Sequence, residues 1–529
     1  MKTLKMIPMI FVLSLLMTVT GHSQKKELVE KRTKYSKTYL NENGAYTTEI
    51  SAGPVHYRNE QDLFVKIDRS VKAARAEDYD YEITSGLYHA YFKSNLHYEW
   101  PVVFETSEGA NLKSQLIGMA FLDGAKKDYQ VIESVKNNPP VVSGNEITYP
   151  DVFRGVDMVI KYEDQRLKEE ILMSQQARML LPDPAQYGLK SQTAYIVFIT
   201  MLDLKGAPEI YGDNMKIRNL DFVSDHPIHF RDLKGDVKFF LPIDWAFHEE
   251  DRDSLDESRM LKIRRFLLHN EDGSFLLSGV KLKHLEKMKA GTIIFDPSTT
   301  LNTPDKCNDT FIAGDIYGYE ERQNYNYGGA DYLQIWNYGN APTHQRRRSL
   351  LKFDLSGIAA EAEITEAKLK LYCYDVIDID NGKSYPARID VHKMLNAWDE
   401  GNANGTSGLT NWNARLDDGN QILNWGQSGG DYVETAVDFI RAESDGWLEW
   451  NILPLAEEWH VNPSGNYGVM VKLNNDEDTD VYQYFRFYSS EHGDDDFRPR
   501  LEISYTIGTI KTTYYIRDAA GNVIATYEK

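Results

Sequence analysis

Aromatic and basic side chains gather at two places in the second half of this sequence. Trp336 and Tyr338 come shortly before the run Arg346–Arg348, and a second aromatic run extends from Tyr482 to Tyr488. In a β-strand, residues two apart share one face, so Arg486 would lie among tyrosines of the second run. Flat aromatic rings beside polar donors are surfaces on which sugar rings stack. The alternative interpretation is that one of these faces belongs to the core of an ordinary β-sandwich.

On this pattern the sequence offers seven candidate carbohydrate-binding residues. They are Trp336, Tyr338, Arg346, Arg347, Tyr482, Tyr484 and Arg486.

The negative net charge of the chain limits the kinds of molecule that it can bind. The formal net charge is -21, and residues 303–506 hold 17 Lys and Arg against 35 Asp and Glu, so nearly all the excess lies in the second half. Such a balance argues against binding to nucleic acid or to an anionic membrane. An acidic glycan would need local guanidinium groups to pair with its carboxylates, and Arg346–Arg348 is the concentrated basic patch.

Closely spaced carboxylates in the second half suggest a structural calcium ion, because that cation prefers oxygen ligands. Asp476, Asp478 and Asp480 are the candidate ligands. The stretch does not match the twelve-residue calcium loop between two helices, since no Gly stands at its sixth position. The alternative is a turn whose carboxylates are simply solvated.

Catalytic signatures are few. Asp399 and Glu400 could suggest glycoside hydrolysis, but adjacent residues on a strand point to opposite faces. The sequence contains no H-E-x-x-H, no G-x-S-x-G, no glycine-rich phosphate loop and no zinc-spaced Cys and His set. We therefore expect a protein that binds rather than an enzyme, with no certain cofactor.

The elements that position these residues are predicted to be mainly β. Short alternating runs broken by Gly, Asn and Pro fill residues 39–297, which we interpret as an N-terminal β-rich region of one or two sandwiches. Residues 303–506 hold seven of the nine tryptophans and alternate strictly from Ala367 to Cys373. One short helix is predicted from Leu453 to Trp459, with Pro in its first turn.

The N-terminus has the order of a secretory signal peptide. Lys2 and Lys5 precede an apolar run that ends in small residues, which predicts a signal over residues 1–23 with cleavage near Ser23 and a secreted protein. Residues 24–38 are polar and predicted to be a flexible lead-in. The apolar run is too short to span a membrane, and no later segment is long enough. Cys307 and Cys373 allow either a disulfide or buried thiols.

The second half resembles the DNRLRE-type domain, which is grouped with carbohydrate-binding module family 96. The matching stretches follow the family order, and they are Asp309-Thr310-Phe311-Ile312, Asn326-Tyr327-Gly328, Trp398-Asp399-Glu400-Gly401, Thr410-Asn411-Trp412-Asn413, Tyr488-Ser489-Ser490-Glu491 and Arg498-Pro499-Arg500-Leu501. This resemblance implies a jelly-roll-like β-sandwich over residues 303–506 that binds extracellular polysaccharide, acidic glycans included. The matching residues themselves look structural, since they are strand cores and turn formers.

The flanks resemble a second family, the Rhs-repeat secreted proteins. The stretch from Tyr46 to Tyr57 is similar to the N-terminal β-region of such shells, and the tail over residues 507–529 is similar to the opening of their repeat core. The repeats that build the shell are missing. A second hypothesis is therefore a truncated N-terminal part of an Rhs-type surface shell or delivery protein, with a structural or adhesive role and downstream shell components as partners.

Overall fold

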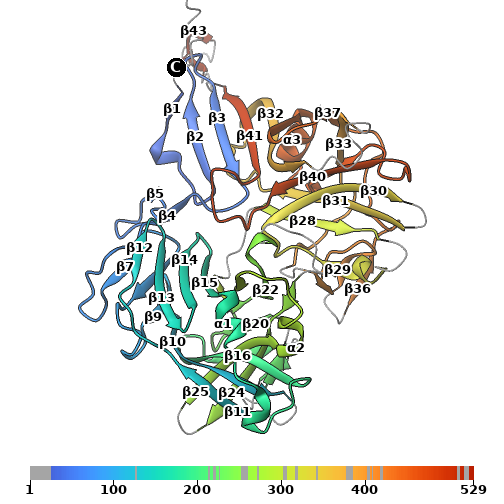
Figure 1. The fold of residues 1–529 in the computed structure, drawn as a ribbon. Helices are drawn as coiled ribbons and strands as arrows, with labels where there is room; N and C mark the ends of the chain where they lie inside the picture. The colour runs from blue at the N-terminus through green and yellow to red at the C-terminus, as the bar shows by residue number, and fades with distance from the viewer. Residues whose placement is uncertain are drawn as a thin grey trace, which may run out of the picture.

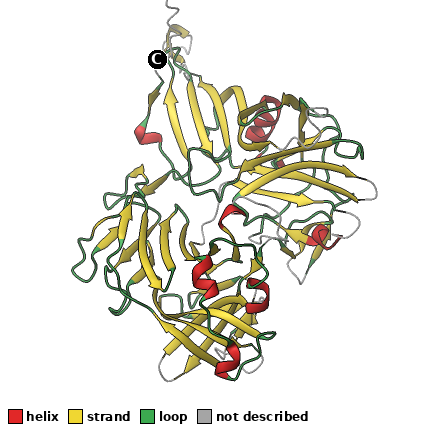
Figure 2. Ribbon diagram, in the orientation of Figure 1, coloured by secondary structure: helices red, strands yellow, loops and turns green. Residues whose placement is uncertain are grey.

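The computed structural model describes most of the chain. The described residues are 25–124, 128–212, 215–217, 222–224, 227–251, 260–270, 273–301, 307–315, 320–340, 343–376, 385–401, 405–407, 409–417, 421–508, 513–517 and 523–528. The predicted signal peptide, Ser23 included, lies outside them. The described part is mainly β, and its paired strands run antiparallel, which confirms the predicted fold class (Figure 2).

Two large sheets form the first lobe, which we define as residues 68–301 and which lies in the lower part of Figure 1. The first sheet runs in the order β19 (Phe222–Ser224), β24 (Arg264–Asn270), β25 (Gly273–Lys281), β16 (Ala194–Lys205), β10 (Asn111–Asp123), β9 (Val102–Thr106), β8 (Tyr88–Phe92), β7 (Tyr81–Ile83) and β6 (Lys72–Ala73), with β11 (Asp128–Ser134) paired to β10.

The second sheet of this lobe contains the strands that reach the other half of the molecule. Its order is β12 (Val141–Ser143), β13 (Glu146–Phe153), β14 (Val156–Tyr162), β15 (Arg166–Met173), β27 (Ser298–Leu301), β21 (Val237–Leu241), β20 (Ile228–Arg231), β17 (Glu209–Gly212) and β18 (Met215–Lys216). Beside this path lie β22 (Trp245–His248), β23 (Leu261–Lys262) and β26 (Ile293–Phe295).

One hydrophobic core lies between these two sheets. Phe121 on β10 and Phe198 on β16 belong to it together with Tyr149 on β13 and Phe239 on β21, so both sheets contribute buried aromatic rings. The short helices α1 (Gln175–Met179) and α2 (Leu282–Leu285) bury Ala177, Leu282 and Leu285 against the same core. The alternating strands of the first half therefore pack as one sandwich.

The second lobe, residues 307–508, is built on one long curled sheet that N-terminal strands complete. Its order is β1 (Lys26–Glu27), β2 (Ser36–Leu40), β3 (Tyr46–Ser51), β41 (Arg500–Ile507), β32 (Ala362–Val376), β40 (Tyr482–Tyr488), β30 (Tyr332–Asn340), β31 (Thr343–Phe353), β39 (Val469–Leu473), β33 (Ala387–Lys393) and β37 (Asp438–Ala442), with β28 (Cys307–Ala313) on β31 and β38 (Gly446–Asn451) on β32.

Long strands allow this sheet to enclose a core of its own. The strand β32 pairs with β41 along its first part and with β40 near its end, and β31 pairs likewise with β30 and then with β39. Leu333 of β30, Leu369 of β32 and Val471 of β39 consequently bury their side chains in a single cluster. The sheet thus wraps around a main core, as expected for a β-sandwich, and a smaller cluster that includes Trp398, Trp412 and Trp425 is separate from it.

The N-terminal strands correct the predicted division of the chain. Residues 24–38 were expected to be a flexible lead-in, yet their described part, residues 25–38, includes β1 and most of β2. The next strand, β3, pairs with β41 from Tyr46↔Tyr505 to Ser51↔Arg500. Figure 1 shows these blue strands beside the red β41. Residues of this polar segment alternate between buried and half-buried positions, as in a strand. Thr38 is one of the buried residues, and its hydroxyl lies 2.9 Å from that of Thr48.

Local predictions in the second lobe are confirmed. Ala367, Leu369, Leu371 and Cys373 are all fully buried, as their alternation requires. The helix α3 (Leu453–Val461) has Pro in its first turn and buries Leu455 and Trp459. Cys307 and Cys373 are both free thiols, and burial raises the pKa of the Cys373 thiol to about 12.

Smaller pairs complete the described structure. They are β4 (His56–Arg58) with β5 (Phe64–Lys66), β29 (Tyr325–Asn326) with β34 (Thr406–Ser407), β35 (Ala414–Asp417) with β36 (Ile422–Asn424), and β42 (Thr513–Arg517) with β43 (Val523–Glu528). The last pair is a hairpin in the predicted tail. Of the helices described, none is both long and apolar enough to cross a membrane.

Candidate carbohydrate-binding surface

Most of the predicted sugar-binding residues share one face of adjacent strands. In the register of β30 and β40, Trp336 lies opposite Tyr484 and Tyr338 lies opposite Tyr482, while Trp336 also lies opposite Arg347 on β31. Directly opposed residues of an antiparallel pair point to the same face. The rings of Trp336 and Tyr484 are 4.9 Å apart and those of Tyr338 and Tyr482 are 5.2 Å apart. We call this set, with Arg486, the aromatic face.

Exposure divides the aromatic face into a buried middle and an accessible edge. Tyr484 is 3% exposed and Arg347 is 4% exposed, so neither offers a surface to a ligand. Trp336, Tyr338 and Tyr482 are half-buried. The buried Nε1 of Trp336 has no hydrogen-bond partner within the described structure. The edge formed by these three rings is therefore the part of the predicted set that can contact a sugar.

The arginines of the predicted set are each held by a carboxylate of the same lobe. Arg347 donates to Asp315, with Nη2 to Oδ2 at 3.0 Å, and the carboxylate is fully buried. The Nη1 of Arg486 lies 3.4 Å from the carboxylate of Asp375, and its Nε donates to the hydroxyl of Tyr484. These contacts fix the guanidinium groups within the fold and neutralise them.

Arg346 lies away from the aromatic face. Its guanidinium packs 4.7 Å from the ring of Trp412 and is paired with Glu477. Its neighbour Arg348 packs 4.8 Å from the same ring. The structure thus separates Arg346 from the other predicted residues, because consecutive residues of β31 point in opposite directions.

The three carboxylates predicted for calcium are not brought together. Asp476 is buried, accepts a hydrogen bond from Arg348 at 2.6 Å and forms an ion pair with Lys472 at 2.9 Å, whereas Asp478 and Asp480 are exposed. Burial alone would raise the pKa of Asp476, but the two cations beside it hold that pKa below its usual value. Asp476 therefore serves as the counter-ion of buried basic groups.

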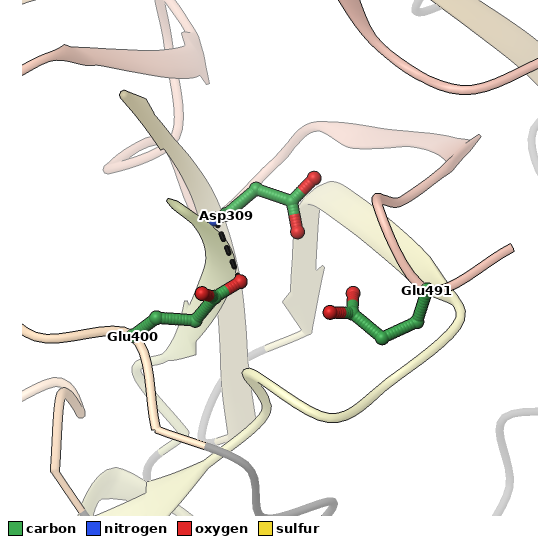
Figure 3. A group of neighbouring side chains, drawn as sticks. All are labelled: Asp309, Glu400 and Glu491. Carbon is green, nitrogen blue, oxygen red and sulfur yellow. Dashed lines mark hydrogen bonds between the residues drawn. The ribbon is translucent and has the colours of Figure 1, made fainter. Parts of the chain in front are cut away.

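A different acidic group, which the sequence reasoning missed, occurs where the family motifs meet. Asp309, Glu400 and Glu491 each bring a carboxylate oxygen within 4.8 Å of the other two, and Figure 3 shows the three side chains converging. Within the described residues, these three form the group of acidic side chains close enough together to hold a metal ion. Three carboxylates offer oxygen ligands of the type that a hard cation such as calcium takes.

Hydrogen bonds show what this acidic group already does in the fold. The backbone nitrogen of Asp309 donates to Glu400 Oε1 at 2.8 Å, and Ser490 donates to Asp309 from its backbone nitrogen and its hydroxyl, both at 2.9 Å. Asn326 donates to the carbonyl oxygen of Glu400 and to that of Thr410. The motif residues thus tie β28 to turns far along the chain. We call Asp309, Glu400, Glu491 and Ser490 the carboxylate clamp.

Comparisons with known proteins find two distant relatives. The chain is 22% identical over 525 residues to the tRNA3(Ser)-specific nuclease WapA of Bacillus spizizenii, and 22% identical over 530 residues to the tRNA nuclease WapA of Bacillus subtilis. Each alignment covers 95% of this chain and 19% of the relative, so the chain spans about a fifth of their length. This distant similarity to Rhs-repeat proteins confirms the second resemblance.

The family comparison matches the first part of the second lobe. Residues 306–414, which contain the first two members of the carboxylate clamp and the start of the aromatic face, match the model of carbohydrate-binding module family 96. The DNRLRE-type resemblance is confirmed over this stretch. The chain therefore contains a carbohydrate-binding module of family 96.

Proposed function

We propose that this protein binds extracellular polysaccharide without catalysis, through its second lobe. The observation that carries the proposal is the coincidence of a family 96 match at residues 306–414 with half-buried rings of Trp336, Tyr338 and Tyr482 on one strand face. Half-exposed tryptophan and tyrosine provide the flat apolar surface that sugar rings require.

The preferred ligand is a neutral polysaccharide rather than a polyuronate. Arg347 and Arg486 already pair with carboxylates of the lobe, and Arg346 pairs with Glu477. Residues 303–506 also carry about twice as many acidic as basic side chains. A polyanion would therefore be repelled by the lobe without gaining a guanidinium partner.

The site of action is outside the cytoplasm, since the ligand is extracellular and the first 23 residues have the order of a signal peptide. The test is to express the full chain with its leader and to sequence the N-terminus of the exported protein. A mature N-terminus at Gln24 supports this proposal, while retention of the full chain inside the cell contradicts it.

The similarity to WapA favours a second candidate function. Because it extends over 95% of this chain, it includes the first lobe as well as the family 96 module. The chain would then be the front part of an Rhs-type surface shell, in which the module is an adhesive spacer. A reading frame that continues a repeat core after the codon of Lys529 would favour this function, and an unrelated sequence there would favour the first.

The binding test uses the full mature chain on an array of neutral polysaccharides and polyuronates, followed by calorimetry on each hit. We expect Tyr338→Ala and Tyr482→Ala each to weaken binding by about two- to tenfold, since stacking on one ring contributes roughly 0.5–1.5 kcal/mol. Tyr98→Ala is the matched control, because Tyr98 is 57% exposed and lies in the first lobe. Binding that survives both edge variants, or its absence across the array, would contradict the proposal.

A further inference from the structure

A cavity of about 690 Å³ lies at the junction of the two lobes. Its walls come from β14, β15 and the segment around Trp245 in the first lobe, and from the ends of β30, β32 and β40 in the second. The volume falls within the range of pockets that hold small ligands. The outer edge of the aromatic face is not part of this wall, so the cavity is a separate place.

The second lobe contributes a stack of aromatic rings to this cavity. Tyr488 packs against Tyr374 with ring centres 4.4 Å apart and an interplanar angle of 15°, and against His492 at 3.7 Å. Tyr332 lies opposite Tyr488 in the register of β30 and β40. Since Tyr332 and Tyr488 are six residues from Tyr338 and Tyr482 respectively, the cavity lies about 20 Å along the same strand face.

The first lobe contributes the ring of Trp245 and a buried carboxylate oxygen that lacks a hydrogen-bond donor. Trp245 lines the cavity, half-buried, with the ammonium of Lys262 5.2 Å from its ring. Asp296 pairs through Oδ2 with Lys168 at 3.0 Å, but its buried Oδ1 has no hydrogen-bond partner in the described structure. A buried carboxylate oxygen without a donor is costly, and a ligand hydroxyl would relieve it.

The charges of the wall nearly cancel. Four Arg and Lys side chains face five Asp and Glu side chains around the cavity. Lys168 of the first lobe and Asp331 of the second interact electrostatically across it. A wall with both donors and acceptors, aromatic rings and little net charge suits a neutral polyhydroxylated ligand more than an ion.

We propose that this cavity between the lobes binds the end of a neutral oligosaccharide, with Trp245 and Tyr374 against the sugar rings and Asp296 accepting a hydroxyl. The inference rests on the proposed function in that the ligand is a glycan. It differs in the place of binding, which involves both lobes and is not formed by the family 96 module alone.

Ion pairs keep the cavity walls in place. Arg69 of the first lobe lines the cavity and bridges Asp164 of its own lobe and Asp495 of the second. Asp164 in turn lies 3.2 Å from Arg498 of the second lobe. The walls are therefore held before any ligand arrives, and binding need not order two separate domains.

The test measures binding of neutral hexose oligosaccharides of four to six units to the full mature chain by calorimetry. We expect Asp296→Asn and Tyr374→Ala each to weaken binding by at least tenfold, whereas Tyr98→Ala, at an exposed position outside the cavity, should bind with the original affinity. Circular dichroism and thermal melting check that each variant is folded. Trp245→Phe, which keeps a ring, should lose less affinity than Trp245→Ala.

Hydrogen exchange on the same samples locates the ligand without any variant. Protection of both 242–247 and 488–494 on adding oligosaccharide supports the cavity. Protection confined to 334–340 and 482–486, with loss of binding in Tyr338→Ala alone, overturns the cavity and leaves the proposed function standing. If the unmodified chain binds a polysaccharide on the array but no oligosaccharide, the cavity proposal alone is overturned, and if it binds neither, both proposals are overturned.

Discussion

Arg498 of the second lobe lies 3.2 Å from Asp164 of the first, and the two side chains are 1% and 0% exposed. Arg69 reaches the same carboxylate from the first lobe, with Nε to Oδ1 at 2.8 Å. Arg498 also donates to the carbonyl oxygen of Pro54, which precedes the β4–β5 hairpin. A buried ionic network therefore joins the second lobe to the first.

Removing the carboxylate of this network should loosen the junction. We expect Asp164→Asn to lower the free energy of unfolding by about 3 kcal/mol, because Arg498 is then buried without its carboxylate. Calorimetry should show the melting transition broaden or split as the lobes uncouple. Asp62→Asn is the control, since Asp62 pairs with Arg58 on the exposed surface, and it should leave the transition unchanged. A sharp, unshifted transition in Asp164→Asn would contradict this role.

A buried carboxyl group inside the first lobe should make stability depend on pH. Burial raises the pKa of Glu169 to about 7, against the opposing hydrogen bond from Ser114. The folded state thus holds this proton more tightly than the unfolded state, whose carboxyl has its usual pKa near 4.5. The stabilisation is complete below that value and is lost as the pH rises through 7.

The variant Glu169→Gln has no proton to lose at this position. We expect its stability relative to the original protein to rise by about 2 kcal/mol between pH 5 and pH 8. Urea unfolding at the two pH values measures the difference. Glu361→Gln, at an exposed position, should show no such change. An equal difference at both pH values for Glu169→Gln would show that the carboxyl titrates normally.

Strand-level features of this protein follow from its sequence because they depend on neighbours along the chain. The alternation in Tyr482–Tyr488 correctly predicts which residues share a face, and the alternation from Ala367 to Cys373 predicts the buried face of β32. The helix Leu453–Val461 follows from the position of its proline. In each case the periodicity within a few residues carries the information.

Local periodicity could not predict which side chains become buried by segments far away in the sequence. Tyr484 and Arg347 lie on the predicted face, but both are buried, and Arg347 pairs there with Asp315, which is 32 positions away. The carboxylate clamp joins Asp309 to a residue 91 positions away and to another 181 positions away. Although the family motifs mark these residues, only the folded chain shows that their side chains meet. The cavity likewise depends on how the two lobes are placed.

The carboxylate clamp should contribute more to the free energy of unfolding than an exposed surface carboxylate does. Glu400→Ala removes the acceptor of the Asp309 backbone nitrogen and of the Asn308 amide, which lies 3.1 Å from Oε2. We expect a loss of about 2–3 kcal/mol in the free energy of unfolding, because a buried donor is left without a partner. Glu457→Ala on the exposed side of α3 is the control. Equal melting temperatures for the two variants would mean that the clamp adds nothing.

The pairing of β3 with β41 predicts how the second lobe behaves alone. A fragment of residues 303–508 lacks β1–β3 and leaves the edge of β41 open, where Tyr46 would stack on Tyr505. Open edges recruit other strands, so we expect this fragment to self-associate and to melt at a lower temperature. The comparison protein carries residues 25–58 fused after residue 508, so that β1–β3 are supplied again. A flexible linker of about six residues is long enough, because the end of β41 and the start of β1 are roughly 15 Å apart across four strands. Size-exclusion chromatography and thermal melting should show this fusion to be monomeric and more stable. If the two proteins behave alike, the N-terminal strands are dispensable and the lobe folds from its own residues, because the supplied strands then add no stabilising edge.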